Sequence, residues 1–371
     1  MKLGYFTLDD NSPLYGEHLR KPEVMLKEIV EHAVRCDELG FSSFWVPEHH
    51  GPTFGMLPTP GAMVGHLAAK TKRIQLGVAC VVLPINQPLR IAEEYGVLDH
   101  LSAGRVSVAF GRGFDDCDYK MFGVPFHDSR EILREGVELV VRAWTRKGFT
   151  YEGKFYQVTE PCTLNQYPLQ RPHPEVYIAC WSRGTLEMAA ELGCHVMFTP
   201  FSAGLAFGGL GPAASEHKRL AREAGHTGAL KAACSYFCAV ATDSQDARRH
   251  RERLLRLLRG LVPAIPHDLS KAPANLAYFV DIARKIEAMD ADELGDGSIA
   301  TGDAEKVTEI LKRAEAAGID ETILNVYFGG ISHRDALEQL ERLAKSVLPH
   351  FENATVEHRR APGLAPRPPR G

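Results

Sequence analysis

The sequence predicts an α/β protein built as a closed (β/α)8 TIM barrel with insertions. Short apolar strands alternate with longer amphipathic helices, and eight such units can be counted along the chain. The connections are short, as parallel strands with outer helices require. An open dinucleotide-binding sheet would also alternate in this way, but no G-x-G-x-x-G follows any predicted strand. The 371 residues are enough for one barrel of about 250 residues with insertions.

The predicted strands are short and apolar, as parallel strands covered on both faces should be. They span residues 3–6, 41–46, 73–84, 104–113, 175–181, 195–198, 232–241 and 321–329. The third, RIQLGVACVVLP, is apolar nearly throughout. This uniform apolarity favours strands buried between two layers over strands with one solvated face.

Helices with apolar residues at helical spacing follow most of these strands. They are predicted over residues 23–40, 58–71, 87–102, 128–148, 183–193, 244–261 and 334–351. The first closes on Gly40, and the helix from 128 has a cap in Asp128 or Ser129 and ends at Gly148. Residues 149–165 read as a hairpin-like excursion.

Two segments interrupt this alternation. Residues 263–302 carry prolines and a possible helix over 276–289, and they lie between the seventh and eighth units. We expect this insertion to hang over the rim where barrel active sites lie, as a lid. The barrel domain is therefore predicted over 1–354. Residues 355–371, ending RRAPGLAPRPPRG, are expected to form a disordered tail rich in proline and arginine.

Composition narrows the class of protein. The net charge of −4 gives no reason to expect nucleic acid or a membrane as a partner, and no apolar run is long enough to span a bilayer. The N-terminus, MKLGYFTLDD, lacks a signal-peptide profile, which favours a cytoplasmic protein. Of the 8 cysteines, Cys234 and Cys238 are closest, with no second pair to complete a zinc site. Reduced, buried thiols fit this pattern.

Active-site residues of such a barrel follow the carboxyl ends of its strands. The candidates at these positions are Glu48, His49, His50, Leu83, Pro84, Arg112, Gly113, Trp181, Ser182, Thr199, Tyr327 and Phe328. The set is aromatic and apolar, with one arginine, a few hydroxyls and two histidines. It suits a flat conjugated ligand with one anionic end better than a sugar or a metal.

The stretch WSRGTLEMAAELG could hold that anionic end. It places Ser182, Arg183, Gly184 and Thr185 at a helix N-terminus, where free N–H groups and the helix dipole attract a phosphate. Arg112 follows the neighbouring strand and carries a guanidinium suited to phosphate oxygens. The alternative is structural, with the serine as an ordinary helix cap and the arginine paired to a following aspartate.

The stretch FWVPEHHGPTFG has three interpretations. Adjacent residues of an extended chain point to opposite faces, so His49 and His50 could share a metal only if the chain turned there. The third, fourth and fifth strand ends offer no further metal ligand, and no metal is expected. Two interpretations stay open. The histidines are a structural pair, or one imidazole serves as general acid or base while the other holds Glu48 or a backbone carbonyl.

Three stretches together resemble the bacterial luciferase-like flavin monooxygenases. They are WVPEHH, the run LGVACVVLPINQPLRIAEEYGVLDHLSAGRVSVAFGRGF with MFG after it, and VYIACWSRGTLEMAAELG. The similarity continues through GSIATGDAEKVTEILKRAEAAGIDETILNVYFGG to about residue 350. The combination of E-H-H, L-D-x-L-S-x-G-R and the R-G past the fourth strand is specific, although each motif alone would be weak.

This resemblance implies a cofactor, a partner and a reaction. Family members are usually dimeric barrels that take reduced flavin mononucleotide (FMN) from a separate NAD(P)H-dependent flavin reductase. Oxygen then forms a flavin 4a-hydroperoxide that oxygenates a small organic substrate. Hydroxylation, epoxidation and Baeyer–Villiger insertion all stay open, because loops set this choice on a shared scaffold.

The resemblance also assigns residues. His49 matches the catalytic histidine, and Glu48 and His50 are predicted to act with it. The predicted cofactor-binding residues are Ala79, Cys80, Arg112, Gly113, Trp181, Ser182, Arg183, Gly184 and Thr185. Of these, Arg112, Ser182 and Thr185 match residues around the flavin phosphate. Ala79 and Cys80 match a pair under the flavin ring that a non-proline cis peptide can join.

The chain departs from luciferase at two positions. A reactive cysteine is replaced by Gly111, and a carboxylate before the phosphate serine is replaced by Trp181. Both changes favour a relative that takes another, ring-shaped substrate on which Trp181 could stack. Two rival functions stay open, namely a deazaflavin-dependent hydride-transfer enzyme on the same barrel and a non-catalytic flavin-binding subunit.

Overall fold

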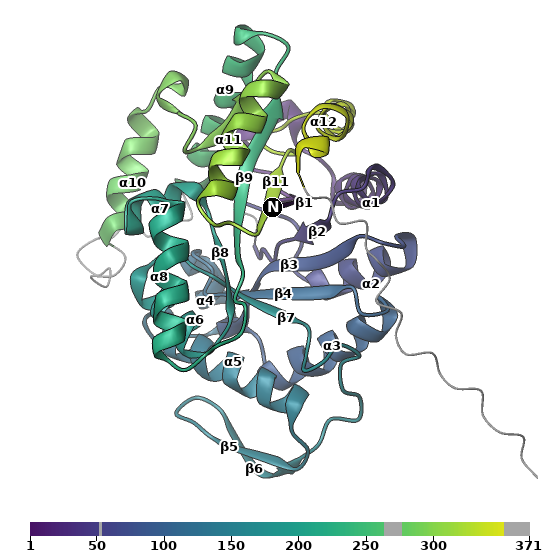
Figure 1. Ribbon diagram of the computed structural model, residues 1–371, viewed down its shortest axis with the longest axis vertical. Helices are drawn as coiled ribbons and strands as arrows, with labels where there is room; N and C mark the ends of the chain where they lie inside the picture. Colours follow the sequence, from purple (N-terminus) through teal and green to yellow (C-terminus); the bar gives the residue numbers. More distant parts are fainter. Residues whose placement is uncertain (52–53, 263–276, 352–371) are drawn as a thin grey trace, which may run out of the picture.

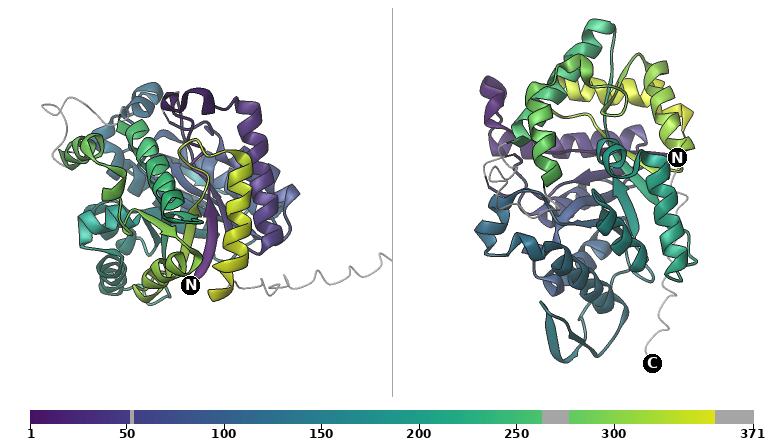
Figure 2. Two further views of the ribbon diagram at one scale, coloured as in Figure 1. Left: turned by 90° about the horizontal axis from the view of Figure 1, so that it is seen from above. Right: turned by 90° about the vertical axis from the view of Figure 1, so that its left-hand side faces the viewer.

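The computed structural model describes residues 1–51, 54–262 and 277–351 and shows a closed parallel barrel ringed by helices (Figures 1 and 2). The strands are β1 (Lys2–Phe6), β2 (Ser43–Val46), β3 (Gln75–Val82), β4 (Val106–Gly111), β5 (Phe149–Glu152), β6 (Gln157–Cys162), β7 (Glu175–Ala179), β8 (His195–Phe198), β9 (Ala232–Val240), β10 (Ile299–Gly302) and β11 (Glu321–Asn325). Their order is β10-β9-β11-β1-β2-β3-β4-β7-β8, and β9 also pairs with β8. That last pairing closes the predicted (β/α)8 barrel.

The helices lie outside the strands, and Figure 2 shows α1 beside α12 on one flank. They are α1 (Pro22–Leu39), α2 (Pro60–Lys70), α3 (Pro88–Leu101), α4 (Asp116–Phe122), α5 (Ser129–Thr145), α6 (Arg183–Glu191), α7 (Pro200–Phe207), α8 (Leu210–Glu223), α9 (Ser244–Leu261), α10 (Ala277–Ala288), α11 (Ala304–Ala316) and α12 (His333–Ser346). In α1, Met25, Ile29 and Ala33 are buried at a spacing of four residues. The helix ends at Gly40, whose φ of 86° is left-handed.

The eight predicted barrel strands are confirmed, with ends trimmed by a few residues. The hairpin after α5 is also confirmed, as antiparallel β5 and β6. The strand β10 was not predicted, because four residues within a polar stretch carry too little pattern. It pairs with the second half of β9, beyond the end of β8, so it extends the sheet above the closed barrel.

Asp128 occupies the N-cap position of α5, as predicted, but its side chain does not serve as a cap. Asp128 makes no side-chain cap hydrogen bond, because a 3-10 turn over Phe126–Asp128 leads straight into the helix. The Ser129 hydroxyl is used elsewhere, since it accepts a hydrogen bond of 3.0 Å from Arg112 Nε. A residue that the sequence suggested as a helix cap therefore supports a side chain of the barrel rim.

The predicted insertion is described only in part, because its residues 263–276 lie outside the described residues. The helix α10 confirms the helix expected there, and it packs against α9. The last four residues of the insertion belong to β10. The predicted tail, 355–371, lies wholly outside the described residues.

The interior of the barrel is a packed apolar plug. Its buried side chains are Phe6, Trp45, Ala109, Tyr177, Met197, Ala233 and Ile323. The rings of Trp45 and Tyr177 meet edge to face with centroids 5.7 Å apart. Trp45 pairs in register with Gly77, and a Cβ there would overlap the indole. Gly77 thus makes room for Trp45, the largest side chain of the plug. The plug fills the barrel below the carboxyl ends of the strands.

We expect Gly77→Ala to destabilise the protein by about 1–3 kcal/mol, because the new methyl group overpacks the plug against Trp45. Urea denaturation followed by circular dichroism measures the change. Gly65→Ala on α2 is the matched control, since its Cβ would lie 3.4 Å from Leu98 Cδ2, in ordinary contact. The control should be neutral or stabilising by up to about 1 kcal/mol. Equal stability of both variants would contradict the packing argument.

Candidate active site

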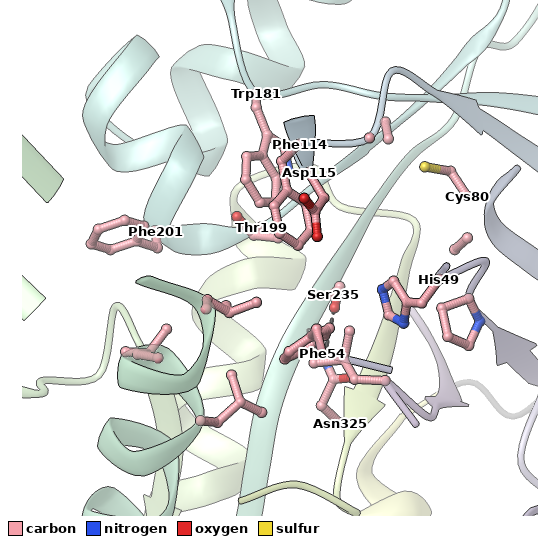
Figure 3. Close-up of a pocket in the computed structure, with 18 of the residues that line it drawn as sticks. His49, Phe54, Cys80, Phe114, Asp115, Trp181, Thr199, Phe201, Ser235 and Asn325 are labelled. Atoms are coloured by element: carbon pink, nitrogen blue, oxygen red, sulfur yellow. Dashed lines mark hydrogen bonds between the residues drawn. The ribbon is translucent and has the colours of Figure 1, made fainter. Parts of the chain in front are cut away.

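A cavity of about 300 Å³ opens at the carboxyl ends of the strands, above the plug (Figure 3). This size matches pockets that bind small organic ligands and cofactors. Its walls are mainly apolar, with aromatic rings from Phe54, Phe114, Trp181 and Phe201. The polar residues that line it are Glu48, His49, His50, Arg112, Asp115, Asp118, Ser182, Thr185, Thr199, Ser235, Ser298 and Asn325.

His49 is held by a carboxylate that the sequence analysis missed. Its Nδ1 lies 2.7 Å from Oδ1 of Asp9, which follows β1 and is fully buried. The other carboxylate oxygen of Asp9 accepts the N–H of Met56 at 2.7 Å. Because Nδ1 is engaged, Nε2 is the ring nitrogen left for a ligand in the pocket.

The charge of Asp9 also sets the proton affinity of the ring. Burial alone would lower the pKa of His49, but the attraction and hydrogen bond of the Asp9 carboxylate outweigh it and raise the pKa above 6.5. A more distant contribution comes from Asp118 on α4, which also lines the pocket. The arrangement therefore favours an imidazolium that can donate a proton from Nε2.

Glu48 and His50 form a second fixed pair. His50 Nε2 lies 2.9 Å from Oε1 of Glu48, whose side chain is buried. That oxygen also accepts a hydrogen bond of 2.8 Å from Asn86 Nδ2, and Oε2 accepts the N–H of Val82 at 3.0 Å. Glu48 thus ties the end of β2 to the end of β3. The two imidazoles have different carboxylate partners, so they do not act as a joint metal site.

The predicted phosphate residues meet at the opposite side of the rim. Arg112, directly after β4, is hydrogen-bonded to Ser129, and its guanidinium carbon lies 5.7 Å from the centre of the Phe126 ring. Ser182 makes no side-chain cap on α6. Its hydroxyl lies 3.0 Å from the Thr185 hydroxyl, and both residues line the pocket. Arg112, Ser182 and Thr185 therefore all line the pocket, the last two at the N-terminus of α6.

Arg130 adds a cation that the sequence analysis missed. Its Nε is buried and has no hydrogen-bond partner among the described residues. A Cβ on Gly184 would lie only 2.8 Å from Nη1 of Arg130, so the glycine lets the guanidinium approach the first turn of α6. A buried unpaired guanidinium N–H is costly unless a ligand occupies it. The only signal in the sequence was a basic residue in the first turn of α5.

Several strand-end candidates lie away from the pocket. Arg183 is exposed and pairs with Glu216 on α8 at 3.3 Å, so only its backbone faces the anion site. Among the described residues that line the pocket, Leu83, Pro84, Tyr327 and Phe328 do not occur. The Tyr327 hydroxyl donates to Glu28 instead. The strand-end rule found the rim but not the direction in which each side chain points.

Two absences concern the described part of the chain. Within residues 1–51, 54–262 and 277–351, no group of three or more histidine, cysteine or acidic side chains could hold a metal ion. In the same ranges, no helix combines the length and apolarity needed to cross a membrane.

The geometry can be compared with known proteins. The profile of the luciferase-like monooxygenases matches residues 1–321. The chain belongs to the luciferase-like monooxygenase family. This membership confirms the resemblance seen in the sequence.

Two relatives show how far the similarity extends. The oxygenase component of flavin-dependent trigonelline monooxygenase from Acinetobacter baylyi is 27% identical over 90% of this chain and 92% of its own length. An uncharacterized protein of Sinorhizobium fredii, y4vJ, is 32% identical over 51% of this chain and 54% of its own length. The chain thus spans about half of the second relative and nearly all of the first.

Solved structures share the fold. Monooxygenase RslO1 from Streptomyces bottropensis has a TM-score of 0.76 and 25% identity, over 94% of this chain and 99% of that one. The oxygenating constituent of 3,6-diketocamphane monooxygenase from Pseudomonas putida, in complex with FMN, has a TM-score of 0.73 and 20% identity over 95% and 98%. An F420-dependent secondary alcohol dehydrogenase has a TM-score of 0.72 and 19% identity over 94% and 98%. The last two show the fold alone.

The departures of this family member from luciferase have a physical reason. The Ala79–Cys80 peptide is cis, as the resemblance implied. A side chain at Gly111 would overlap the Cys80 thiol, so the two positions cannot both carry a thiol in this packing. Burial raises the pKa of Cys80 to about 12, which keeps this thiol protonated and unreactive at neutral pH. Gly113, with φ of 65°, also lines the pocket.

Trp181 forms part of an aromatic wall in this luciferase-like site. Its ring is stacked on Phe114, with centroids 6.1 Å apart and planes 9° apart (Figure 3). Trp181 is 38% exposed, so it sits at the mouth of the pocket. On the same wall, burial and the neighbouring Asp115 raise the pKa of Asp118 to about 6. The rule that active-site residues follow strand ends, which located His49, could also have found Asp9 after the first strand.

We expect Asp9→Asn to lower the pKa of His49 relative to the wild-type protein, because the amide removes the charge that stabilises the imidazolium. Titration of the imidazole resonances by NMR measures this shift. Asp118→Asn is the control, since Asp118 acts through space without a hydrogen bond to His49, and its effect should have the same sign and be smaller. A larger effect of Asp118→Asn would show that Asp9 is not the dominant partner.

Proposed function

We propose that this protein is the oxygenase component of a two-component system, which uses reduced FMN and O2 to oxygenate a small organic substrate. One observation carries the proposal. Arg112, Arg130, Ser182 and Thr185 form a cradle for an anion on one side of an apolar cavity. The carboxylate-held His49 lies on the opposite side. The name of the Acinetobacter baylyi relative supports a flavin-dependent oxygenase with a separate reductase.

The residues present fit FMN. Arg112, Arg130, Ser182 and Thr185 would hold its phosphate at the N-terminus of α6, where the orphan Nε of Arg130 gains a partner. When bound, reduced FMN supplies the two electrons that let one atom of O2 enter the substrate and the other leave as water. The stretch around Ala79 and Cys80 would lie against the ring.

His49 handles the proton in this proposal. Its Nε2 would hold or donate a proton at the reacting atoms, and Asp9 fixes the tautomer by engaging Nδ1. Glu48 and His50 shape the neighbouring wall. Leu258 and Leu261 of α9 and Ile286 of α10 add apolar cover, which excludes water from the reacting atoms. The described part of the insertion acts as the proposed lid.

A deazaflavin cofactor is the rival, since the F420-dependent dehydrogenase shares the fold. Such a cofactor carries a longer, multiply anionic tail. Among the described residues that line the pocket, Arg112 carries the one guanidinium. Arg130 approaches the first turn of α6 at Gly184, and Arg183 is paired with Glu216. Two cations at one helix N-terminus suit a single phosphate, which favours FMN.

The partners follow from the same scheme. A separate NAD(P)H-dependent flavin reductase would supply reduced FMN, and we place both proteins in the cytoplasm. A homodimer would use the outer faces of α2 and α3. On α3, Val97 is 42% and Leu101 is 62% exposed.

We expect Arg112→Ala and Arg130→Ala to weaken FMN binding by about 10- to 100-fold each, since each removes charge-assisted hydrogen bonds to the phosphate. Isothermal titration calorimetry measures the affinity. Riboflavin, which lacks the phosphate, should bind both variants as it binds the wild type. Arg183→Ala, in the first turn of α6, is the matched control and should leave FMN binding unchanged, because its side chain is exposed and paired with Glu216. Equal losses for riboflavin would mean that the arginines support the fold, not the phosphate.

We expect the protein to slow the reoxidation of photoreduced FMN by O2, with a slowly decaying absorbing species visible by stopped flow. Ordinary rapid reoxidation, as for free FMN, would count against an oxygenase.

His49→Ala should bind reduced FMN within about twofold of wild type, because His49 lies away from the phosphate site. It should form no oxygenated product from any compound that the wild type turns over. Unchanged turnover would refute the role of His49.

A further inference from the structure

A polar pair lies at the floor of the pocket, on two neighbouring strands. Asn325 ends β11, and its Nδ2 donates a hydrogen bond of 2.7 Å to the hydroxyl of Ser235 on β9 (Figure 3). Both residues line the cavity. Neither was identified from the sequence. An asparagine at the end of the apolar strand ETILN and a serine within ACSYFCAV give no clear signal.

Strand geometry explains why the pair faces the cavity. Side chains two residues apart on a strand share a face. Ala233 and Ile323 belong to the apolar plug, so Ser235 and Asn325 stand one layer above them on the same inward faces. The pair is therefore the polar top of an otherwise apolar stack, and Phe237 continues the inward face of β9 above it.

One hydrogen-bonding group of this pair has no protein partner. Asn325 is 2% exposed, and its Oδ1 is buried without a hydrogen-bond partner among the described residues. The Ser235 hydroxyl accepts from Asn325, which leaves its own hydrogen free to donate. If the amide is turned over, the free groups become an N–H and a lone pair, so the pair offers one donor and one acceptor in either case. An orphan of this kind calls for a ligand group.

The pair lies on the far side of the barrel from the phosphate cradle. The cradle follows β4 and β7, whereas the pair is on β9 and β11. The next strands in the ring are β1 and β2, which carry Asp9 and His49 at their ends. The pair therefore faces the half of the pocket that contains the proton-handling histidine and not the anionic end of the cofactor.

The half of the pocket that the pair faces is mainly apolar, and its imidazole, His49, is already paired with Asp9. Phe237, two residues beyond Ser235 on the same face of β9, belongs to one apolar cluster that lines this cavity with Leu254, Leu257, Leu258, Leu261 and Leu294. Among the described residues that line the pocket, the only guanidinium or ammonium group belongs to Arg112, at the cradle. A carboxylate in this compartment would lose its hydration, and the charge of the His49 imidazolium is already balanced by Asp9, so an acidic substrate is disfavoured.

We propose that Ser235 and Asn325 anchor the substrate, which is a neutral and mainly apolar molecule with a hydroxyl group. The hydroxyl donates to one member of the pair and accepts from the other, and the hydrocarbon part fills the leucine-lined compartment. This inference rests on the proposed function and assigns a substrate class to the same site.

The test uses two ring probes of similar size, cyclohexanol and chlorocyclohexane, with cyclohexanecarboxylate as a third. Ligand-observed NMR gives their affinities for the full-length protein, with and without FMN. We expect wild type to bind cyclohexanol about tenfold more tightly than chlorocyclohexane, and the carboxylate more weakly than both. Ser235→Ala and Asn325→Leu should reduce the tenfold preference to less than twofold and leave FMN affinity unchanged. Ser235→Ala changes little volume, so it carries the test if Asn325→Leu does not fold.

Ser298→Ala is the matched control, because it removes another hydroxyl that lines the pocket. It should keep the preference for cyclohexanol. The proposal is overturned if wild type shows no preference, if Ser235→Ala keeps it, or if Ser298→Ala abolishes it equally. Equal weakening of FMN by Ser235→Ala would assign the pair to the cofactor instead. Failure of wild type to bind FMN would contradict the proposed function alone, since the probe affinities are measured without FMN as well.

Discussion

Closure of the parallel sheet is the constraint on which the site depends. The pairing of β8 with β9, and of β11 with β1, brings the carboxyl ends of all barrel strands to one rim. Residues as distant in sequence as His49 and Asn325 then face one cavity. The plug around Trp45 fills the barrel below, so ligands are confined to the rim. Without the pairing of β8 with β9, the cradle after β4 and β7 and the pair on β9 and β11 would lie towards opposite ends of one open sheet.

The rim divides into two halves with different chemistry. The half after β4 and β7 offers cations and a helix N-terminus, which suit an anion. The half after β9, β11, β1 and β2 offers the neutral pair of Ser235 and Asn325 beside a carboxylate-held imidazole. A cofactor anchored at one half and a substrate anchored at the other would meet over the middle of the barrel. This division gives the two ligands separate determinants of affinity.

Burial acts differently on the titratable groups of this rim. It raises the pKa of Cys80, where the charge of Glu48 acts in the same direction, and so keeps the thiol neutral. It would lower the pKa of His49, but the fully buried Asp9 reverses the direction. Local charge, and not burial alone, therefore decides which side chain can exchange protons near neutral pH.

The sequence by itself determined the barrel, the hairpin and the rim positions of His49, Arg112 and Ser182, because strand and helix periodicity and strand-end rules are local. Only the tertiary structure revealed the contributions of Asp9, Arg130 and Asn325. Each acts through a partner or an orphaned atom that lies far away in sequence, or on a neighbouring element, and periodicity carries no record of such contacts. The same limit explains why the sequence did not show that Asp128 caps α5 without a side-chain hydrogen bond and that Ser129 binds Arg112. Local pattern decides what an element is, and packing decides what its side chains meet.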